Sequence, residues 1–306
     1  MRLIDRIGTS LSGVHHYARL NPPVGLVWRV GSGVSIYGGY AEANRAPTPT
    51  ELSCADPDQP CSLTAFFLSD PELHQVVSRT FEAGMRGTHK FGHAQLSWRM
   101  GGWRSRNAND IIFTASTTTG RAYFRNVGET QRQGIETELN VAAGSWRGRV
   151  SYVLTDATYR TTFLLNSPDN PNADSEGVIA VAPGNRIPGI AGHRFKASVT
   201  RHSGTRLWVS LDGQYSSGRW FLEDEANLTR PTHNYWLANI SAGLKPAEQV
   251  ELFVEIRNMF DKKYATFGGF SATGDVNFRE APGLTNPRSL SPAAPRTWLL
   301  GARVTF

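Results

Sequence analysis

The sequence lacks the features on which several common protein classes depend. No apolar run approaches the roughly 20 residues that a membrane-spanning helix needs, which leaves a soluble protein or a membrane β-barrel, since only helices and closed barrels span lipid. It contains no Gly-x-Ser-x-Gly, no His-Glu-x-x-His and no phosphate-binding glycine-rich loop, so the nucleophile, zinc and nucleotide sites that these motifs build are not expected. We therefore expect neither an enzyme nor a bound cofactor.

Clustered charge is also missing. The 306 residues include 32 Lys and Arg against 26 Asp and Glu, a net charge of +6, and the basic residues form no run. This spread favours a solvated basic protein over a nucleic-acid binder. Residues 1–10 have no apolar core and do not form a signal peptide, so a protein that works outside the cytoplasm would have its start missing from this sequence.

Cysteine is scarce, and both copies lie close together in a stretch rich in Pro and Asp. A short disulfide loop between Cys54 and Cys61 would suit an oxidising compartment, and two free thiols are the alternative. Two thiols without a nearby His are too few ligands for a metal site. Acidic clusters at 169–174 and 223–225 have oxygen ligands that calcium prefers, but neither has a known calcium-loop spacing.

Alternation of apolar and polar residues predicts β-strands through most of the chain. In 133–142, for example, Ile135, Leu139 and Val141 oppose Glu136 and Glu138. We count eleven such segments of about 9–11 residues, the length that a tilted strand needs to cross a bilayer. A less regular hairpin is expected near 110–127, and an irregularity or bulge at Val153, where the alternation breaks.

The connections between these strands alternate in length. Short turns are expected at Gly31–Gly33, Thr88–Lys90, Ala143–Ser145, Ser203–Thr205 and Lys245–Glu248, with long loops between them. Short periplasmic turns opposite long outer loops are typical of outer-membrane barrels. The expected fold is therefore all-β: part of an antiparallel transmembrane β-barrel. A soluble antiparallel β protein that binds carbohydrate or another partner also alternates, and it stays open as an alternative.

A motif near the C-terminus then indicates a family. The segment from Asn258 to Gly268 resembles the signature Asn-Leu-Phe-Asp-x-x-Tyr of TonB-dependent outer-membrane receptors, and the matching positions are Asn258, Phe260, Asp261 and Tyr264. The final residue, Phe306, looks like the barrel-assembly signal of that family. The segments 37–52 and 121–134 are similar to family strands and their flanking loops.

This resemblance implies a receptor that has a signal peptide, a TonB box, a plug domain and a barrel of about 22 strands. Eleven or twelve strands then make residues 1–306 the C-terminal portion of the barrel, with the plug domain and signal peptide absent. The implied function is uptake of a ferric siderophore or similar bulky nutrient in the outer membrane of a Gram-negative cell. A truncated, transport-incompetent remnant is the alternative, because half a barrel leaves two open strand edges.

The resemblance also implies partners and sites. The partners are outer-membrane lipid, the barrel-assembly machinery through the terminal strand, an iron–siderophore-like ligand, and TonB only through a plug that this chain does not contain. Loop residues that could bind the ligand, or else pack the loops, are Arg45, Phe66, Phe67, Tyr123, Arg125, Trp220 and Phe221. Charges expected to face the lumen and its plug, or else only water, are Arg86, Arg99, Glu136, Glu138, Glu255 and Arg257.

Overall fold

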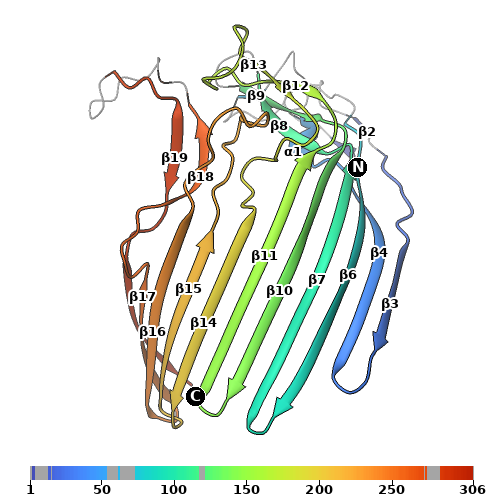
Figure 1. Ribbon diagram of the computed structural model, residues 1–306. Helices are drawn as coiled ribbons and strands as arrows, with labels where there is room; N and C mark the ends of the chain where they lie inside the picture. The colour runs from blue at the N-terminus through green and yellow to red at the C-terminus, as the bar shows by residue number, and fades with distance from the viewer. Residues whose placement is uncertain are drawn as a thin grey trace.

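A single antiparallel sheet of eleven strands dominates the computed structural model (Figure 1). The structure describes residues 2–3, 13–14, 16–53, 61–62, 73–116, 121–271, 273 and 283–305. Along the sheet the order is β20-β17-β16-β15-β14-β11-β10-β7-β6-β4-β3. Each strand therefore pairs with the sheet strands that come just before and just after it in the chain. The predicted eleven-strand antiparallel wall is thus confirmed. Its strands are β3 (Pro23–Arg29), β4 (Val34–Arg45), β6 (Val76–Phe91), β7 (Ala94–Ala108), β10 (Thr130–Ala143), β11 (Trp146–Tyr159), β14 (His193–Ser203), β15 (Leu207–Ser216), β16 (Tyr235–Ala247), β17 (Val250–Arg257) and β20 (Thr297–Val304).

The remaining elements are small and most of them gather at one end of this wall (Figure 1). The hairpin expected near 110–127 exists, but it belongs to a separate small sheet with β5 rather than to the wall. Among the described residues, no helix has the length and apolar character needed to cross a membrane. The small elements are β1 (Arg2–Leu3), β2 (Gly13–Val14), α1 (Pro49–Ser53), β5 (Cys61–Ser62), β8 (Ile111–Ala115), β9 (Arg121–Asn126), β12 (Phe163–Asn166), β13 (Val178–Val181), β18 (Ala265–Phe270) and β19 (Arg288–Pro292).

Three details of the predicted strands and turns were wrong. The turn expected at Thr88–Lys90 lies inside β6, and the chain reverses instead at Gly92, which adopts a φ of 55° that favours glycine. Similarly, Lys245 still belongs to β16, so the next turn begins at Glu248. The strands reach 16 residues in β6, longer than the 9–11 expected, because pairing continues beyond the stretch that a bilayer requires.

No bulge interrupts the wall at Val153. This residue pairs in continuous register with Glu136, and the pairing of β10 with β11 runs without a shift from Thr130 to Ala143. The register shift in the wall occurs instead between Leu244 and Ala247, where β16 meets β17. Val153 therefore lies on the same face as Glu136, and the alternation breaks there without a bulge.

The pairing register divides the wall into two chemically different faces. On one, which we call the apolar face, Leu139 has Trp98 and Val150 as its cross-strand neighbours. On the other, the polar face, Arg99 lies opposite Glu138. Leu139 and Val150 keep 41% and 40% of their surface exposed. Because exposed apolar area on this scale marks contact with lipid or with another protein, the apolar face suits a hydrocarbon environment.

The packed core lies beneath the loops instead of between two sheets. Tyr159 at the end of β11 packs with Phe163 edge-to-face at 5.2 Å, within a buried cluster that joins three of the long connections. The members of this cluster are Val127, Tyr159, Phe163, Leu165, Ile179, Val181 and Ala226. We refer to residues 109–116, 121–129, 160–192 and 217–234 around it as the loop cap.

Candidate functional site

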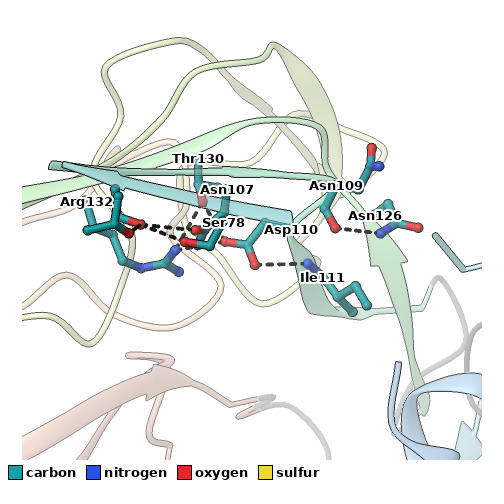
Figure 2. Close-up of polar contacts among 10 residues, drawn as sticks. Ser78, Asn107, Asn109, Asp110, Ile111, Asn126, Thr130 and Arg132 are labelled. Atoms are coloured by element: carbon teal, nitrogen blue, oxygen red, sulfur yellow. Dashed lines mark hydrogen bonds and ion pairs between the residues drawn. The ribbon is translucent and has the colours of Figure 1, made fainter. Parts of the chain in front are cut away.

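The loop cap meets the polar face at a hydrogen-bonded network around Asp110 (Figure 2). The Asp110 carboxylate accepts a hydrogen bond from Thr130 Oγ1 at 2.6 Å and another from Arg132 Nη1 at 3.1 Å. Its other oxygen accepts the backbone N–H of Ile111 at 3.1 Å, where β8 begins. Asp110 thus joins the start of β10 to the β8–β9 hairpin and fixes how that hairpin leaves the wall.

A second carboxylate, that of Asp224, holds two segments of the cap together. Asp224 is fully buried. Its Oδ1 accepts from the Leu228 N–H at 2.8 Å, and its Oδ2 accepts from the N–H and the hydroxyl of Thr229 at 3.0 and 2.8 Å. Asn170, from the β12–β13 connection, donates to Oδ1 at 3.3 Å. Because these donors satisfy both oxygens of the Asp224 carboxylate, its burial is tolerated. The contacts also fix segment 217–234 against 160–192.

The neighbouring carboxyl groups have a different character. Burial raises the pKa of Glu225 to about 8, with a further increase from the charges of Glu223 and Asp224. Burial also raises the pKa of Glu223 to about 7, assisted by Asp169. Glu225 is 6% exposed, and its Oε2 has no hydrogen-bond partner. The cap therefore holds carboxyl groups that favour the protonated state near neutral pH.

Below the cap, the polar face carries a compact charge cluster. Glu138 Oε2 accepts from Arg99 Nη2 and from Arg149 Nη2, both at 2.8 Å, while Asn140 donates to Oε1 at 2.9 Å. Arg86 lies directly opposite Arg99 on the next strand. One carboxylate thus compensates two arginines from the flanking strands.

The register places all six charges predicted to face the lumen on this polar face. Glu136 shares it with Glu138 on β10, and Glu255 and Arg257 form an ion pair with each other at 2.8 Å on β17. Glu138 contacts arginines of both neighbouring strands, whereas Glu255 and Arg257 contact each other within one strand. Whether they meet a plug stays a prediction.

The loop candidates occupy very different environments. Arg45 at the end of β4 is exposed and pairs with Glu51 of α1 at 2.6 Å. Arg125 lies over the Phe163 ring at 5.7 Å and donates to the Leu164 carbonyl at 3.1 Å. Tyr123 on β9 is buried, with 8% of its surface exposed. The structure thus brings Arg125 to the surface of the cap and leaves Arg45 at its edge.

The two aromatic candidates of segment 217–234 lie side by side in sequence but differ in exposure. Phe221 is 1% exposed and stacks on Phe270, with 5.5 Å between ring centres. The guanidinium of Arg288 lies over the Phe221 ring, 4.4 Å from its centre. Trp220 is half-buried, and its carbonyl accepts the Gly189 N–H at 3.0 Å. In this structure Phe221 packs the loops; direct contact of either residue with a ligand stays a prediction.

Several predictions fall on residues that the structure does not describe. Phe66, Phe67, Cys54 and Phe306 lie outside the described residues, and for Cys61 only the backbone of β5 is described. The ligand contacts of the two phenylalanines, the disulfide and the terminal assembly signal therefore stay predictions.

The C-terminal motif forms the corner where β17 leaves the wall. Asn258 has a φ of 49° and Asp261 a φ of 50°, both in the left-handed region that Asn and Asp tolerate. Buried Asn258 donates to the carbonyls of Lys262 and Ala294 at 2.9 and 3.3 Å, and its Oδ1 accepts the Lys262 N–H at 2.8 Å. Asp261 accepts the N–H of Arg296, just before β20, at 2.9 Å.

The aromatic residues of the motif complete this corner. Phe260 contacts Trp236 edge-to-face at 5.6 Å, and Tyr264 lies against Tyr235 at 4.5 Å between ring centres. Each of the four motif residues thus ties β17 to β16 or β20. Within the described residues, the motif acts as a structural corner.

Sequence reasoning missed three residues that the structure brings into the cap. Arg132 and Asp110 were not proposed as site residues, yet they form the network of Figure 2. Arg288 was not singled out, although it covers the Phe221 ring. For Asp110, a signal was available: a lone acid between a strand end and a hairpin commonly caps the turn.

Comparison with known proteins gives a consistent result. The family model described as "TonB dependent receptor-like, beta-barrel" matches residues 5–259. Similar solved structures include the ferric-catecholate import receptor Fiu from E. coli K12, with 17% identity and a TM-score of 0.61 over 93% of this chain and 34% of that one. The ferric yersiniabactin uptake receptor FyuA from Yersinia pestis has 17% identity and a TM-score of 0.63, over 93% and 37% of the two chains. The copper transporter OprC has 13% identity and a TM-score of 0.66, over 94% and 39%. This chain thus spans little more than a third of the length of each.

Proposed function

The chain belongs to the TonB-dependent receptor-like β-barrel family, and from this premise we propose that it forms part of the barrel wall of a receptor that imports a ferric siderophore or a similarly bulky nutrient. Members of this family are outer-membrane proteins. Residues 1–306 would be the C-terminal portion of that barrel, and the other strands and the plug would come from other segments of the receptor.

The observation that carries this proposal is the position of the loop cap at one end of a polar wall. The polar face begins beneath the Asp110 network and continues to the charge cluster around Glu138. An import route needs a hydrophilic surface on the inside and an apolar one against lipid. The wall has both, divided by strand register alone.

The cap supplies chemistry that suits a metal chelate. Arg125 over Phe163 and Arg288 over Phe221 each pair a guanidinium with an aromatic ring. These arginines would bind the anionic oxygens of such a ligand, and the half-buried ring of Trp220 would contact its apolar parts. Ferric chelates of catechols or hydroxamates present both kinds of surface.

The partners follow from the same proposal. A plug domain would contact the charges on the polar face, TonB would act on that plug, and the barrel-assembly machinery would receive the terminal strand. Outer-membrane lipid would cover the apolar face. A transport-incompetent remnant would share the lipid contact and the fold but not the uptake.

Ligand binding tests the proposal directly. The protein is purified from outer membranes in detergent and titrated with a ferric tris-catecholate and a ferric trihydroxamate while tryptophan fluorescence is recorded. We expect saturable quenching by at least one chelate, weakened about tenfold in Arg125→Gln, because a lost charge-assisted hydrogen bond is worth about 1.5 kcal/mol or more. Arg201→Gln is the matched control, since Arg201 lies over Trp146 at the opposite end of the wall.

Three outcomes separate the alternatives. Heat-modifiable gel migration with chelate binding and iron uptake into cells supports the receptor. Heat-modifiable migration without binding or uptake indicates the remnant, and sequencing upstream of Met1 shows whether an in-frame plug exists. A protein that stays monomeric and folded in plain buffer contradicts the barrel altogether.

A further inference from the structure

Three arginines lie on the apolar face near the loop ends of β6 and β7, beyond its apolar side chains. Arg79 on β6 lies directly opposite Arg106 on β7, and Arg104 shares the same face two residues along β7. Arg79 and Arg106 keep 54% and 49% of their side-chain surface exposed. We call Arg79, Arg104 and Arg106 the arginine triad. Like charges placed directly opposite on neighbouring strands destabilise a sheet, so this arrangement needs a reason.

The triad is not neutralised by its neighbours. Gln131 on β10 accepts from Arg104 Nη2 at 2.7 Å and from Arg106 Nε at 3.3 Å. On the polar face a carboxylate, Glu138, lies between two arginines; here a neutral amide oxygen takes that role. Gln131 satisfies hydrogen bonds there but contributes no negative charge.

Carboxylates near the triad compensate only part of its charge. Glu42 lies 3.5 Å from Arg79 but also binds Arg19, and Glu129 lies 3.7 Å from Arg106. A further pair, Arg186 with Asp156 at 3.6 Å, is balanced in itself. The four arginines Arg19, Arg79, Arg104 and Arg106 thus face two carboxylates, which leaves a surplus of 4 − 2 = +2.

An apolar groove opens directly beside the triad. Its volume is about 620 Å³, and most of its lining residues lie on the apolar face, among them Phe81, Ala83, Gly102, Arg104 and Ile135. Glu82 and Asp156 also line it, and Asp156 is paired with Arg186. A Cβ added at Gly102 would approach only the Gly134 carbonyl oxygen, at 3.6 Å. The space above Gly102 is therefore open on the side that lipid would cover.

Aromatic side chains fix the height of this groove relative to a bilayer. Tyr40 contacts Phe81 at 4.6 Å between ring centres, and Tyr152 hydrogen-bonds His193 at 2.8 Å. All four lie on the apolar face, at the loop end of its band. Aromatic girdles mark the boundary between hydrocarbon and headgroups in outer-membrane barrels, so the triad lies at headgroup level and the groove just inside the hydrocarbon.

We propose that the arginine triad and the Gly102 groove bind a phosphate-bearing lipid of the outer leaflet. Its phosphate oxygens would bridge the triad, and one acyl chain would lie in the groove. Arginine guanidinium groups suit phosphate because they bind its oxygens in a planar, bidentate way. The site depends on the outer-membrane location of the family but not on nutrient uptake, and it faces away from the polar wall.

Lipid retention measures this site without any transport assay. The full chain is purified from outer membranes in mild detergent, and bound phospholipid and phosphorylated glycolipid are quantified by native mass spectrometry. The double variant Arg104→Gln and Arg106→Gln is expected to retain about tenfold less phosphorylated lipid, since each loses a charge-assisted contact. Gly102→Leu is expected to reduce retention by filling the groove while leaving the triad intact.

Matched variants control for charge and bulk. Arg201→Gln removes one arginine from the same face at the opposite end of the wall, and Gly213→Leu adds the same side chain at a glycine whose Cβ would have only contacts of 4.0 Å. Both should retain lipid as the unmodified chain does. Heat-modifiable migration verifies that each variant is folded, and the groove variant tests the site even if the arginine variant does not fold.

Two results would overturn the proposal. One is equal lipid retention in all variants. The other is displacement of the phosphorylated lipid by inorganic phosphate together with unchanged retention in Gly102→Leu, because the site would then recognise a free anion and not a lipid.

Discussion

Asp224→Asn should loosen the loop cap. The substitution keeps the size of the side chain and one oxygen, but it turns the other oxygen into an NH₂ group. If the retained oxygen stays at Oδ1, the new NH₂ faces the Thr229 N–H, which now donates at 3.0 Å to Oδ2. If the amide flips, Leu228 loses its acceptor instead. Either orientation leaves a buried N–H facing another donor.

The magnitude follows from these contacts. A buried donor left without an acceptor costs about 1–3 kcal/mol, and the remaining hydrogen bonds to Asp224 lose the extra strength that its charge provides. We expect a total of about 3 kcal/mol in the free energy of opening the cap. At about 1.4 kcal/mol for each factor of ten, the opening constant should rise roughly a hundredfold.

Hydrogen exchange measures this opening locally, because a cap can unfold while the wall stays intact. Exchange of peptides from 163–181 and 217–234 is followed in detergent, with wall peptides from β10 as the internal reference. Glu176→Gln is the control: it removes a charge from an exposed side chain of the same cap. A change below about threefold in Asp224→Asn would refute the view that Asp224 joins the two segments.

Further predictions concern the cap, the corner, the wall and the disulfide. Burial raises the pKa of Glu225 to about 8 in the fold, so the folded cap keeps a proton that the unfolded chain releases at lower pH. The stability of the cap should therefore fall as pH rises from about 4.5 to 8, measured as weaker protection of its amides in hydrogen exchange. Glu225→Gln should flatten this pH dependence. Asn258→Ala should lower the stability of the fold by about 2–4 kcal/mol, because it removes buried hydrogen bonds and places Ala in the left-handed region. The level of heat-modifiable protein in outer membranes should fall accordingly. Asn258→Gly should lose only the hydrogen bonds, because glycine adopts this backbone conformation without strain. Glu138→Gln should lower the free energy of unfolding by about 1 kcal/mol for two exposed ion pairs, seen as a slightly lower thermal midpoint, and the difference should shrink in high salt. A difference independent of salt would contradict the ion-pair account. Thiol titration of the denatured, non-reduced chain should find no free thiol if Cys54 and Cys61 are bridged, and two reactive thiols would exclude the bridge.

The wall could be predicted from the sequence because each strand faces two different solvents. Alternation such as Leu139 against Glu138 therefore repeats along every strand and shows which side chains share a face. Strand ends were less predictable, since beyond the bilayer both faces become polar, as at Gln131 and Arg132, and the pattern disappears while the pairing continues. The turn after β6 was misplaced because Thr88 to Lys90 looks polar enough for a turn, whereas the chain reverses at Gly92.

The candidate site was less predictable, because its contacts join residues distant in sequence. Parity placed Glu138 and Arg99 on one face, but the register was needed to show that Arg149 shares the same carboxylate. Asp224 and Glu225 resemble a solvated acidic loop in the sequence. Their burial depends on Asn170, more than 50 residues away, and no local pattern reports such a partner.

The strand order of the wall has a consequence for how such a chain assembles. Each strand pairs only with the sheet strands before and after it, so the wall can grow one hairpin at a time, each new strand adding to the edge just formed. The short turns keep each closure local and fast. A long connection adds little to this cost, because doubling the length of a flexible loop costs only about 0.6 kcal/mol. The long loops are thus free to change in length and sequence while the order of assembly beneath them stays the same.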